Sequence, residues 1–362
     1  MVVDLANLSR DLGHEVSVCV TRDRDDLAAD LAQAIPRHVL HRRSRFDLRG
    51  AYRLVRLIRS SAPDILHVHG RSSFSLVAFL KTLRLIHGSV ACLLHDHYGK
   101  ILLDARVPWW FRHWARRYVD LYVGVSPALR TWAAGAGIPK EKILIIENGL
   151  DLRRFQGRER VDARSLIGCP EDVPLGIVVC GIRPEKGIDL LLSALSRQSS
   201  PFCVLIVGPD ADPEYAAACR HQVTNLGLAG RILFTGPRTD VPALLRGCDF
   251  ALMPSRSESG PLVLIEYLLA GLPFVSTLAG GIAEGLAKSG LAGFVPPGDE
   301  EAFANALAEL ISLPRDRLRH RGRMGPFIAA AGYGLEHRMD AWNQAYQTAG
   351  RGIATKRETS AR

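Results

Sequence analysis

The chain has 362 residues, of which 47% are hydrophobic and 23% are charged. This composition is typical of a folded globular protein, and the length predicts two domains. No apolar run approaches the roughly 20 residues of a membrane-spanning helix, and the N-terminus lacks the basic and apolar segments of a signal peptide. The net charge of +9 favours an anionic partner such as a nucleotide, lipid head groups or nucleic acid.

The seven cysteines are scattered, mostly in apolar segments, and no two of them form a Cys-x-x-Cys pair. Cysteines in apolar segments are typical of small buried core residues rather than of a disulfide framework or a metal site. Reduced cysteines of this kind are typical of a protein in the cytoplasm. We therefore expect a cytoplasmic location.

Short apolar runs alternate with helix-like segments along the whole chain, a pattern typical of βαβ units with parallel sheets. A doubly wound domain ordinarily begins with a strand and a Gly-rich turn, but this chain begins in a predicted helix. Either the true start lies upstream or the first strand is missing. The predicted helices of the first half are 2–12, 49–59, 72–83 and 108–118. The predicted strands are 15–20, 64–69, 89–94, 120–125 and 142–147, and then 174–180, 202–207, 231–235, 248–253, 273–276 and 292–295.

These elements predict an α/β protein with two Rossmann-like, doubly wound domains. The N-terminal domain is expected over 1–150 and the C-terminal domain over 173–334, joined by a charged linker over 151–172. A last helix over about 335–348 is expected to pack back on the N-terminal domain. The polar tail, 349–362, is expected to be disordered.

The stretch Pro254–Gly271 combines a buried strand end, a polar loop and an apolar helix. Pro261 suits the first helical turn and Gly271 the position after the last. A carboxylate in an apolar helix is costly without donors, yet the helix contains Glu266 and the loop before it contains Glu258. Carboxylates accept hydrogen bonds from hydroxyls, so Glu266 suits a vicinal diol such as a ribose, and Glu258 suits sugar hydroxyls.

Free N–H groups at the start of this helix would face an anion such as a phosphate. Ser259 and Gly260 suit the cap, and the N–H groups of Leu262 and Val263 follow Pro261. The alternative is structural: Glu258 would be a solvated loop residue, and Glu266 would pair with a buried arginine.

Two further groups of polar residues follow predicted strands, where α/β sheets bind ligands. Lys186 stands beside Gly187 at a helix start, where a cation is disfavoured unless an anion binds there too. His95-Asp96-His97 follows the strand 89–94. This triplet suits a turn, a sugar contact or a metal site, but no further set of metal-ligating residues stands at ligand spacing in the sequence. We therefore expect no metal.

The sequence resembles a family 4 glycosyltransferase of the GT-B fold, a retaining class that uses nucleotide-sugars. The resemblance covers almost the whole chain. The family motif of two glutamates separated by seven residues matches Glu258 and Glu266, within Pro254-Ser255 and Gly271-x-Pro273. Other matches are Gly13-His14-Glu15-Val16, His67-Val68-His69-Gly70, Asn148-Gly149-Leu150-Asp151, Glu185-Lys186-Gly187, Gly280-Gly281-Ile282-Ala283-Glu284 and Val295-Pro296-Pro297-Gly298-Asp299.

The resemblance implies a role for each candidate site residue. Glu266 would bind the nucleotide ribose, and Lys186 would neutralise the diphosphate. Glu258, with Ser259, Gly260, Pro261 and Leu262, would bind the donor sugar and phosphates, and His95 would face the sugar across the cleft between the domains. The family often has an arginine five residues before the lysine; here that position is Gly181, and Arg183 is the nearest substitute.

Two basic, aromatic segments lie in the first half and predict a membrane surface with anionic lipids as a partner. The helix Arg49–Arg59 is one, and 108–118, with Trp109, Trp110 and Trp114, is the other. Alternatively, the first is a solvated basic face and the second is core packing. No motif that reads nucleic acid is found. The arginines in and just before the first segment are Arg37, Arg42, Arg43, Arg45, Arg49, Arg53, Arg56 and Arg59.

The predicted function is transfer of a sugar from a nucleotide-diphosphate-sugar to a glycan or lipid-linked acceptor. The resemblance implies retention of configuration and a metal-independent reaction with no cofactor besides the donor substrate. The expected setting is polysaccharide or glycolipid assembly at the inner face of the plasma membrane. Two alternatives are a non-catalytic GT-B partner of an active transferase and a GT-B nucleotide-sugar epimerase.

Overall fold

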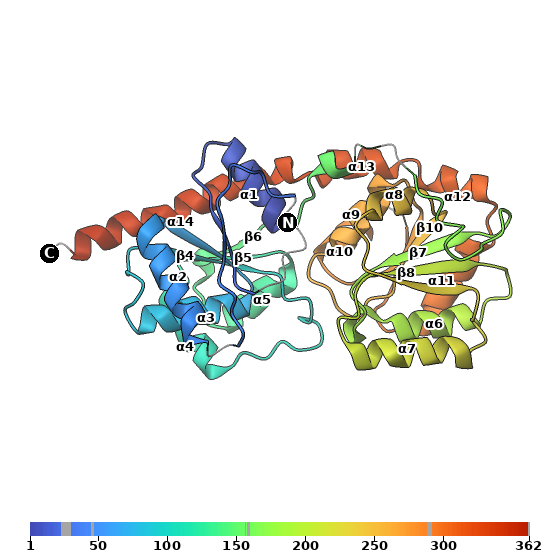
Figure 1. Cartoon of the computed structure of the whole chain (residues 1–362), viewed down its shortest axis with the longest axis horizontal. Helices are drawn as coiled ribbons and strands as arrows, with labels where there is room; N and C mark the ends of the chain where they lie inside the picture. The colour runs from blue at the N-terminus through green and yellow to red at the C-terminus, as the bar shows by residue number, and fades with distance from the viewer. Residues whose placement is uncertain (23–29, 45–46, 156, 158–159, 288–291, 361–362) are drawn as a thin grey trace. The chain divides into compact units, whose positions relative to one another are not determined.

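The computed structural model divides the chain into two compact units, each built around a parallel sheet (Figure 1). It describes residues 1–22, 30–44, 47–155, 157, 160–287 and 292–360. The first unit contains residues 1–98, 105–149 and 335–362, and the second contains 99–104 and 150–334. The chain passes from one unit to the other mainly at 149–150 and 334–335, where the sequence changes from one α/β pattern to the next.

The second unit is organised around a six-stranded parallel sheet in the order β12-β11-β10-β7-β8-β9. Its strands are nearly continuous apolar runs because helices cover both faces. All the strands predicted for this half are present, with ends shifted by one or two residues. They are β7 (Leu175–Val179), β8 (Cys203–Val207), β9 (Ile232–Gly236), β10 (Phe250–Met253), β11 (Phe274–Thr277) and β12 (Gly293–Val295).

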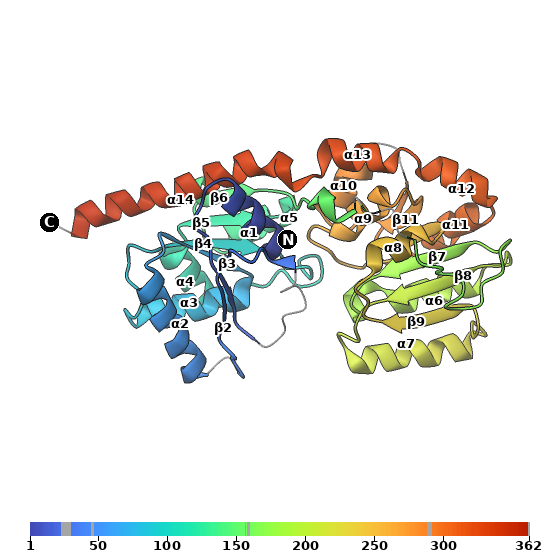
Figure 2. The same cartoon turned by 45° about the horizontal axis from the view of Figure 1, so that its top comes forward.

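Two apolar cores lie on the two faces of this sheet. One core is formed with α6 (Ile188–Ser196), α7 (Pro213–Asn225) and α11 (Glu300–Ile311), and α6 and α7 lie together on that face in Figure 2. The other is formed with α8 (Val241–Arg246), α9 (Leu262–Leu269), α10 (Gly281–Ala287) and α13 (Gly325–Gly332), while α12 (Arg315–Gly322) extends the first core.

The first unit has a four-stranded parallel sheet in the order β3-β4-β5-β6 and a separate parallel pair, β1-β2. Strand β4 is buried along its whole length. The predicted strand 89–94 is displaced by two residues, so that His95 and Asp96 end the strand instead of following it. The strands are β1 (Val18–Val20), β2 (Arg37–Val39), β3 (Ile65–His69), β4 (Ala91–Asp96), β5 (Leu121–Gly124) and β6 (Ile143–Ile145).

Helices cover both faces of this sheet as well. The long helix α14 (Met339–Ser360) packs on one face together with α1 (Val2–Asp11), and Trp342 is its largest fully buried side chain. Helices α2, α3 and α4 lie on the opposite side of the sheet in Figure 2. The remaining bounds are α2 (Leu48–Ser61), α3 (Arg71–Thr82), α4 (Trp109–Tyr118) and α5 (Pro127–Gly135).

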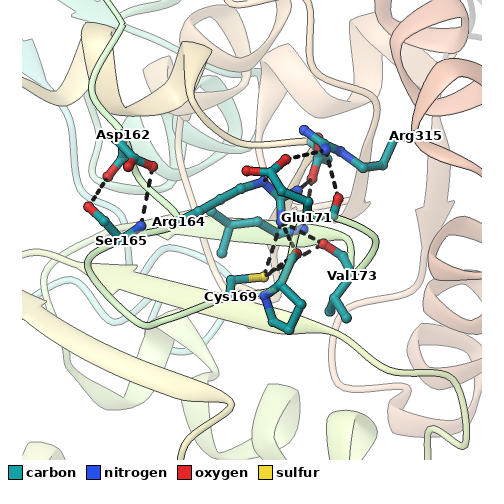
Figure 3. A network of polar contacts seen from close by, with 10 residues as sticks. Asp162, Arg164, Ser165, Cys169, Glu171, Val173 and Arg315 are labelled. Carbon is teal, nitrogen blue, oxygen red and sulfur yellow. Dashed lines mark hydrogen bonds and ion pairs between the residues drawn. The ribbon is translucent and has the colours of Figure 1, made fainter.

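The segment predicted to be a linker, 151–172, belongs to the second unit and is bound to it by a buried arginine (Figure 3). Arg164 forms an ion pair with Asp249, at the start of β10, and donates to the carbonyl oxygens of Pro170 and Val173 at 2.6 and 2.8 Å. Arg315 of α12 donates to the other oxygen of Asp249 at 2.9 Å. The charges that suggested a linker here bind the segment to the second unit.

The tail is the other difference. The expected disordered segment, 349–362, continues α14 as far as Ser360, and residues 361 and 362 lie outside the described part of the chain. The segment contains no proline, and alanine, lysine, arginine and glutamate favour helix. Among the described residues, no helix is long and apolar enough to cross a membrane.

Replacing Trp342 tests the packing of α14. The side chain is fully buried, whereas Trp109 is 82% exposed. We expect Trp342→Ala to lower the free energy of unfolding of the first unit by about 3–5 kcal/mol, because a large cavity opens in its core. Trp109→Ala, the matched control, should change it by less than about 0.5 kcal/mol. Urea unfolding followed by circular dichroism measures both, and equal effects would contradict this packing.

Candidate functional site: a strand crossover in the second unit and a histidine cluster in the first

The sheet order of the second unit creates a switch point between β7 and β10. Successive strands run from β7 to β8 and β9 on one side, and from β10 to β11 and β12 on the other. In open α/β sheets, ligands bind at the carboxyl ends of the strands where the order reverses in this way. Lys186 follows β7 and Glu258 follows β10, so the topology brings both predicted residues to this point.

Lys186 and Glu258 form an ion pair at the switch point. The Nζ atom of Lys186 lies 2.5 Å from Oε1 of Glu258, and the two side chains are 15% and 10% exposed. Ser255 Oγ donates to the same carboxylate oxygen at 2.8 Å. Breaking such a buried pair on one side costs about 3–5 kcal/mol, so each charge holds the other in place. Glu258 is therefore not the solvated loop residue of the alternative interpretation.

Two glycines let the loops of this site approach closely. Gly187 has φ +66°, and a Cβ there would lie 2.2 Å from the carbonyl oxygen of Pro254. Gly280 has φ +88°, and its Cβ would lie 2.9 Å from the carbonyl oxygen of Ser259. Any side chain would push these loops apart. The loops after β7, β10 and β11 are thus packed backbone to backbone.

Helix α9 ends before Gly271, as the sequence predicts, but it begins one residue later than expected: Pro261 is the N-cap, and neither Ser259 nor Gly260 caps the helix. Tyr267, on its buried face, holds it to the sheet: its hydroxyl donates to Leu252 O at 3.0 Å and accepts from Val179 N at 3.2 Å. Glu266 is half-buried on the adjoining face of the helix. The first N–H groups of the helix, at Leu262 and Val263, have no partners within it.

Arg256 also fixes the loop that contains Lys186. It binds both oxygens of Asp189 at 2.7 Å and donates to Pro184 O at 2.9 Å. Burial alone would raise the pKa of Asp189, but hydrogen bonds from Arg256 and Tyr215 lower it below its usual value. Arg183, predicted to bind phosphate, lies 3.1 Å from Glu185, with its side chain 42% exposed.

A short segment, residues 99–104, also belongs to this unit and contacts the loop that contains Glu258. Ser257 Oγ donates to Gly99 O at 2.6 Å and accepts from Leu102 N at 3.2 Å. Lys100 Nζ lies 3.4 Å from the buried carboxylate of Glu185. The segment therefore adds another positive charge beside the loops that contain Lys186 and Glu258.

In the first unit, four histidines gather at the ends of β3 and β4. His67 Nε2 lies 3.1 Å from His95 Nδ1, and His69 Nδ1 lies 3.3 Å from His97 Nε2. Burial, with a smaller contribution from neighbouring charge, lowers the pKa of His67 to about 3 and that of His97 to about 4. The other two pKa values are lowered well below normal, mainly by burial, so all four rings are neutral at pH 7.

This cluster corrects one step of the sequence analysis. We expected no further metal-ligating residues near His95, but His67, His69 and His95 offer ring nitrogens that all lie within 4.8 Å of one another. The pairing of β3 with β4, which sets His69 directly beside His95, brings them together. Separation along the chain concealed this, because cross-strand register is a tertiary property.

Asp96 anchors the end of β4 beside the cluster. The fully buried carboxylate accepts from Arg71 Nε and the Tyr122 hydroxyl, both at 2.9 Å, and from Tyr98 N at 3.0 Å. Burial and the neighbouring Asp96 charge raise the pKa of Tyr122 above its usual value, so the hydroxyl keeps its proton. Arg71 also stacks on Trp132, 3.5 Å from the ring centre. These contacts therefore fix the end of β4.

Two family models match the two halves of the chain. Residues 1–154 match "Glycosyltransferase Family 4" and residues 174–312 match "Glycosyl transferases group 1". The chain belongs to glycosyltransferase family 4. A D-inositol 3-phosphate glycosyltransferase of Nocardia farcinica is 30% identical over 252 residues, which are 65% of this chain and 51% of that protein. One of Mycobacterium tuberculosis is 29% identical over 223 residues, 59% of this chain and 45% of that protein. The chain thus spans about half the length of the curated relatives it matches.

Similar solved structures have the same two-domain GT-B fold. HepE of Anabaena, solved with UDP and glucose, has a TM-score of 0.76 at 21% identity. The match covers 99% of this chain and 95% of the HepE chain. A sucrose-phosphate synthase of Thermosynechococcus elongatus has a TM-score of 0.74 at 21% identity, covering 96% of this chain and 92% of its own. At these identities the likeness establishes the fold alone.

Sequence reasoning missed the residues that position the site. Arg256 reaches Asp189 of α6, and Ser257 bonds the segment 99–104, only in the folded chain, and their sequence neighbourhoods contain no distinguishing pattern. Gly187 and Gly280 gave a weak signal, since each stands in a matched motif, but their steric role needs the facing backbone. The cluster partners His67 and His69 were visible as alternating histidines on one strand.

The neutral histidines make the first unit sensitive to acid. The pKa of His97 is about 4 in the folded chain and about 6.5 when exposed, so the unfolded state binds the proton first as the pH falls below about 6.5. The stability that His97 contributes is therefore lost between about pH 6.5 and 4, by about 2 kcal/mol at pH 5. His97→Gln should reduce the drop in melting temperature between pH 7 and 5, measured with a chelator present. The control His113→Gln, at an exposed position, should not; an unchanged drop in His97→Gln would contradict the assignment.

Proposed function

We propose that this chain transfers a sugar from a nucleotide-diphosphate-sugar to a glycan or lipid-linked acceptor, with retention and without a catalytic metal. The observation that carries the proposal is the Lys186–Glu258 ion pair at the crossover of β7 and β10, next to the start of α9. A buried cation beside free helix N–H groups suits a diphosphate. Adjacent carboxylates suit ribose and sugar hydroxyls.

Each residue has a role in this proposal. Lys186 and the N–H groups at the start of α9 stabilise the negative charge that develops on the departing diphosphate, where preorganised donors contribute most. Glu266 accepts hydrogen bonds from the ribose, and Glu258 accepts from the sugar. Arg183 supplements Lys186 once it turns from Glu185. His95, in the first unit, is the catalytic residue that family resemblance assigns to the sugar.

The named relatives support the substrate class. The Nocardia and Mycobacterium relatives are called D-inositol 3-phosphate glycosyltransferases, and HepE was solved with UDP and glucose. WaaG, a glycosyltransferase involved in lipopolysaccharide biosynthesis, has a TM-score of 0.67 at 16% identity and covers 90% of each chain. These names support our proposal that the reaction belongs to polysaccharide or glycolipid assembly.

A nucleotide-release assay tests the reaction. The purified chain is incubated with UDP-, GDP- and ADP-sugars, with and without bacterial membrane lipids as acceptors. Release that depends on the acceptor is expected for transfer. Conversion of the donor sugar without an acceptor would instead indicate an epimerase. No reaction with any donor would contradict the enzymatic proposal and favour a non-catalytic partner.

Replacing Glu266 tests the donor site. We expect Glu266→Ala to weaken binding of the preferred nucleotide-sugar at least tenfold, about 1.4 kcal/mol, because the ribose hydroxyls lose their acceptor. Glu301→Ala removes an exposed carboxylate on α11 and serves as the control. Isothermal calorimetry measures both affinities. Wild-type affinity in Glu266→Ala would refute the ribose role.

We also propose a peripheral association of the first unit with anionic membranes. The apolar residues Leu54, Val55 and Ile58 of α2 are buried in the unit itself, so they do not form the lipid-facing surface. The exposed face instead combines arginines with Leu48 and Tyr52, which are 76% and 67% exposed. Arg45, part of the same basic stretch, lies outside the described residues.

Vesicle co-sedimentation tests this surface. The triple variant Arg49→Gln, Arg56→Gln, Arg59→Gln should reduce binding to anionic vesicles at low salt by about tenfold or more, since each arginine contributes about 1 kcal/mol near the surface. The control replaces the exposed arginines of α12 in the second unit, Arg317, Arg319 and Arg321, with glutamine and makes the same charge change. Equal losses in both would mean that net charge alone attracts the vesicles, and the proposed surface would be wrong.

A further inference from the structure

A polar pocket lies in the second unit at the amino end of β10, where Asp249 precedes the strand. It is lined by residues 160–164, by the ends of α8 and α9 and by the start of α12. Its volume is about 390 Å³, and pockets for small molecules measure about 300–1,000 Å³. Lys186 and Glu258 follow the carboxyl ends of their strands and do not line it. The pocket is therefore a second place for a ligand, separate from the candidate site described above.

Arginines outnumber acids in the lining of this pocket. Five positive charges against three negative charges leave a surplus of two positive charges. Arg160 and Arg319 are exposed and form no ion pair among the residues that the structure describes. Arg315 and Arg319 lie four residues apart on α12, where like charges repel each other unless an anion lies beside them. The charged lining residues are Arg160, Arg164, Arg246, Arg315, Arg319, Asp162, Glu171 and Asp249.

The carboxylate of Glu171 shows where an anion fits in this pocket. Its Oε2 atom lies 3.1 Å from Arg315 Nη1 and 4.0 Å from Arg164 Nε, and Figure 3 shows Glu171 beside both arginines. Arg164 Nε is buried and has no hydrogen-bond partner in the described part of the chain, since 4.0 Å is too long for one. The Glu171 side chain is 86% exposed, and exposed ion pairs contribute little to stability. A ligand with a higher negative charge can therefore replace this carboxylate at little cost.

The other side of the pocket suits hydroxyl groups. Gly247 follows α8, and Ala270 and Gly271 follow α9. The last carbonyl groups of a helix have no partners within it and carry partial negative charge. They therefore accept hydrogen bonds from hydroxyls and disfavour a second phosphate. Because a free phosphate ion would fill only part of the volume, the lining fits one phosphate joined to a hydroxylated body.

We propose that this pocket binds a small phosphate monoester with several hydroxyl groups, such as a sugar phosphate. Arg160, Arg315 and Arg319 bind the phosphate, which displaces the carboxylate of Glu171. The hydroxyls donate to carbonyl oxygens at the ends of α8 and α9. The ligand thereby joins residues 160–171 to α12. The site lies wholly in the second unit, and the inference does not rest on the proposed transfer reaction.

Isothermal calorimetry on the full chain at low salt tests this site, with ribose 5-phosphate as the probe. We expect saturable binding, and binding of inorganic phosphate that is weaker by about fivefold or more, because the hydroxyl contacts are missing. The double variant Arg160→Gln, Arg319→Gln should weaken binding of ribose 5-phosphate by about tenfold or more, because hydrogen bonds from charged groups are lost. The control Arg317→Gln, Arg321→Gln removes the same charge from exposed positions of α12 outside the pocket and should bind like wild type.

Replacing Glu171 should have the opposite effect. We expect Glu171→Gln to tighten binding of ribose 5-phosphate by about threefold or more, because it removes the carboxylate that competes with the phosphate. Asp172→Asn makes the same charge change at an exposed neighbour that does not line the pocket, and it should leave the affinity unchanged. Circular dichroism checks the fold of every variant.

Several results would overturn the proposal. Absence of saturable binding of ribose 5-phosphate by the wild-type chain does so by itself, whatever the variants do. Wild-type affinity in the folded double variant or in Glu171→Gln would place the ligand elsewhere, and equal changes in the variants and their controls would reduce the effect to net charge. Equal affinity for inorganic phosphate would leave a simple anion site without a place for the hydroxylated body.

Discussion

The candidate site of the second unit is organised around one interaction, the ion pair between Lys186 and Glu258. It joins the loop after β7 to the loop after β10, where the sheet order reverses. Gly187 permits the contact, because its backbone approaches Pro254 more closely than any side chain would allow. An unliganded lysine at a helix start would be unfavourable, and Glu258 supplies its counter-charge. A diphosphate that takes over this counter-charge would release Glu258 for the sugar.

Positioning groups surround this pair and leave little freedom to the loops. Arg256 binds Asp189 and the loop that contains Lys186, and Tyr267 holds α9 to β10. At the opposite end of β10, Arg164 and Arg315 both bind Asp249, which precedes the strand. Strand β10 is therefore fixed at both ends, which keeps its following loop in register with β7. Such preorganisation reduces the conformational entropy lost when a ligand binds.

Local patterns in the sequence predicted most of the fold. Apolar runs with helical segments between them located the strands, and Pro261 and Gly271 located α9, because these signals depend on near neighbours only. Pattern reasoning failed where tertiary contacts decide: 151–172 is held by buried charges, and His67 meets His95 through strand pairing. In the candidate site, the charged residues were visible from their unusual settings. Their supporting residues, such as Ser255 and Arg256, were not, since their partners come from distant loops.

The most direct test of the account is a crystal structure of the chain with the nucleoside diphosphate that it binds most tightly. The account predicts diphosphate oxygens within hydrogen-bond distance of Lys186 Nζ and of the first N–H groups of α9. It also predicts both ribose hydroxyls on Glu266 and Glu258 separated from Lys186. A nucleotide bound elsewhere, or bound here without contact to Lys186 and Glu266, would contradict the account.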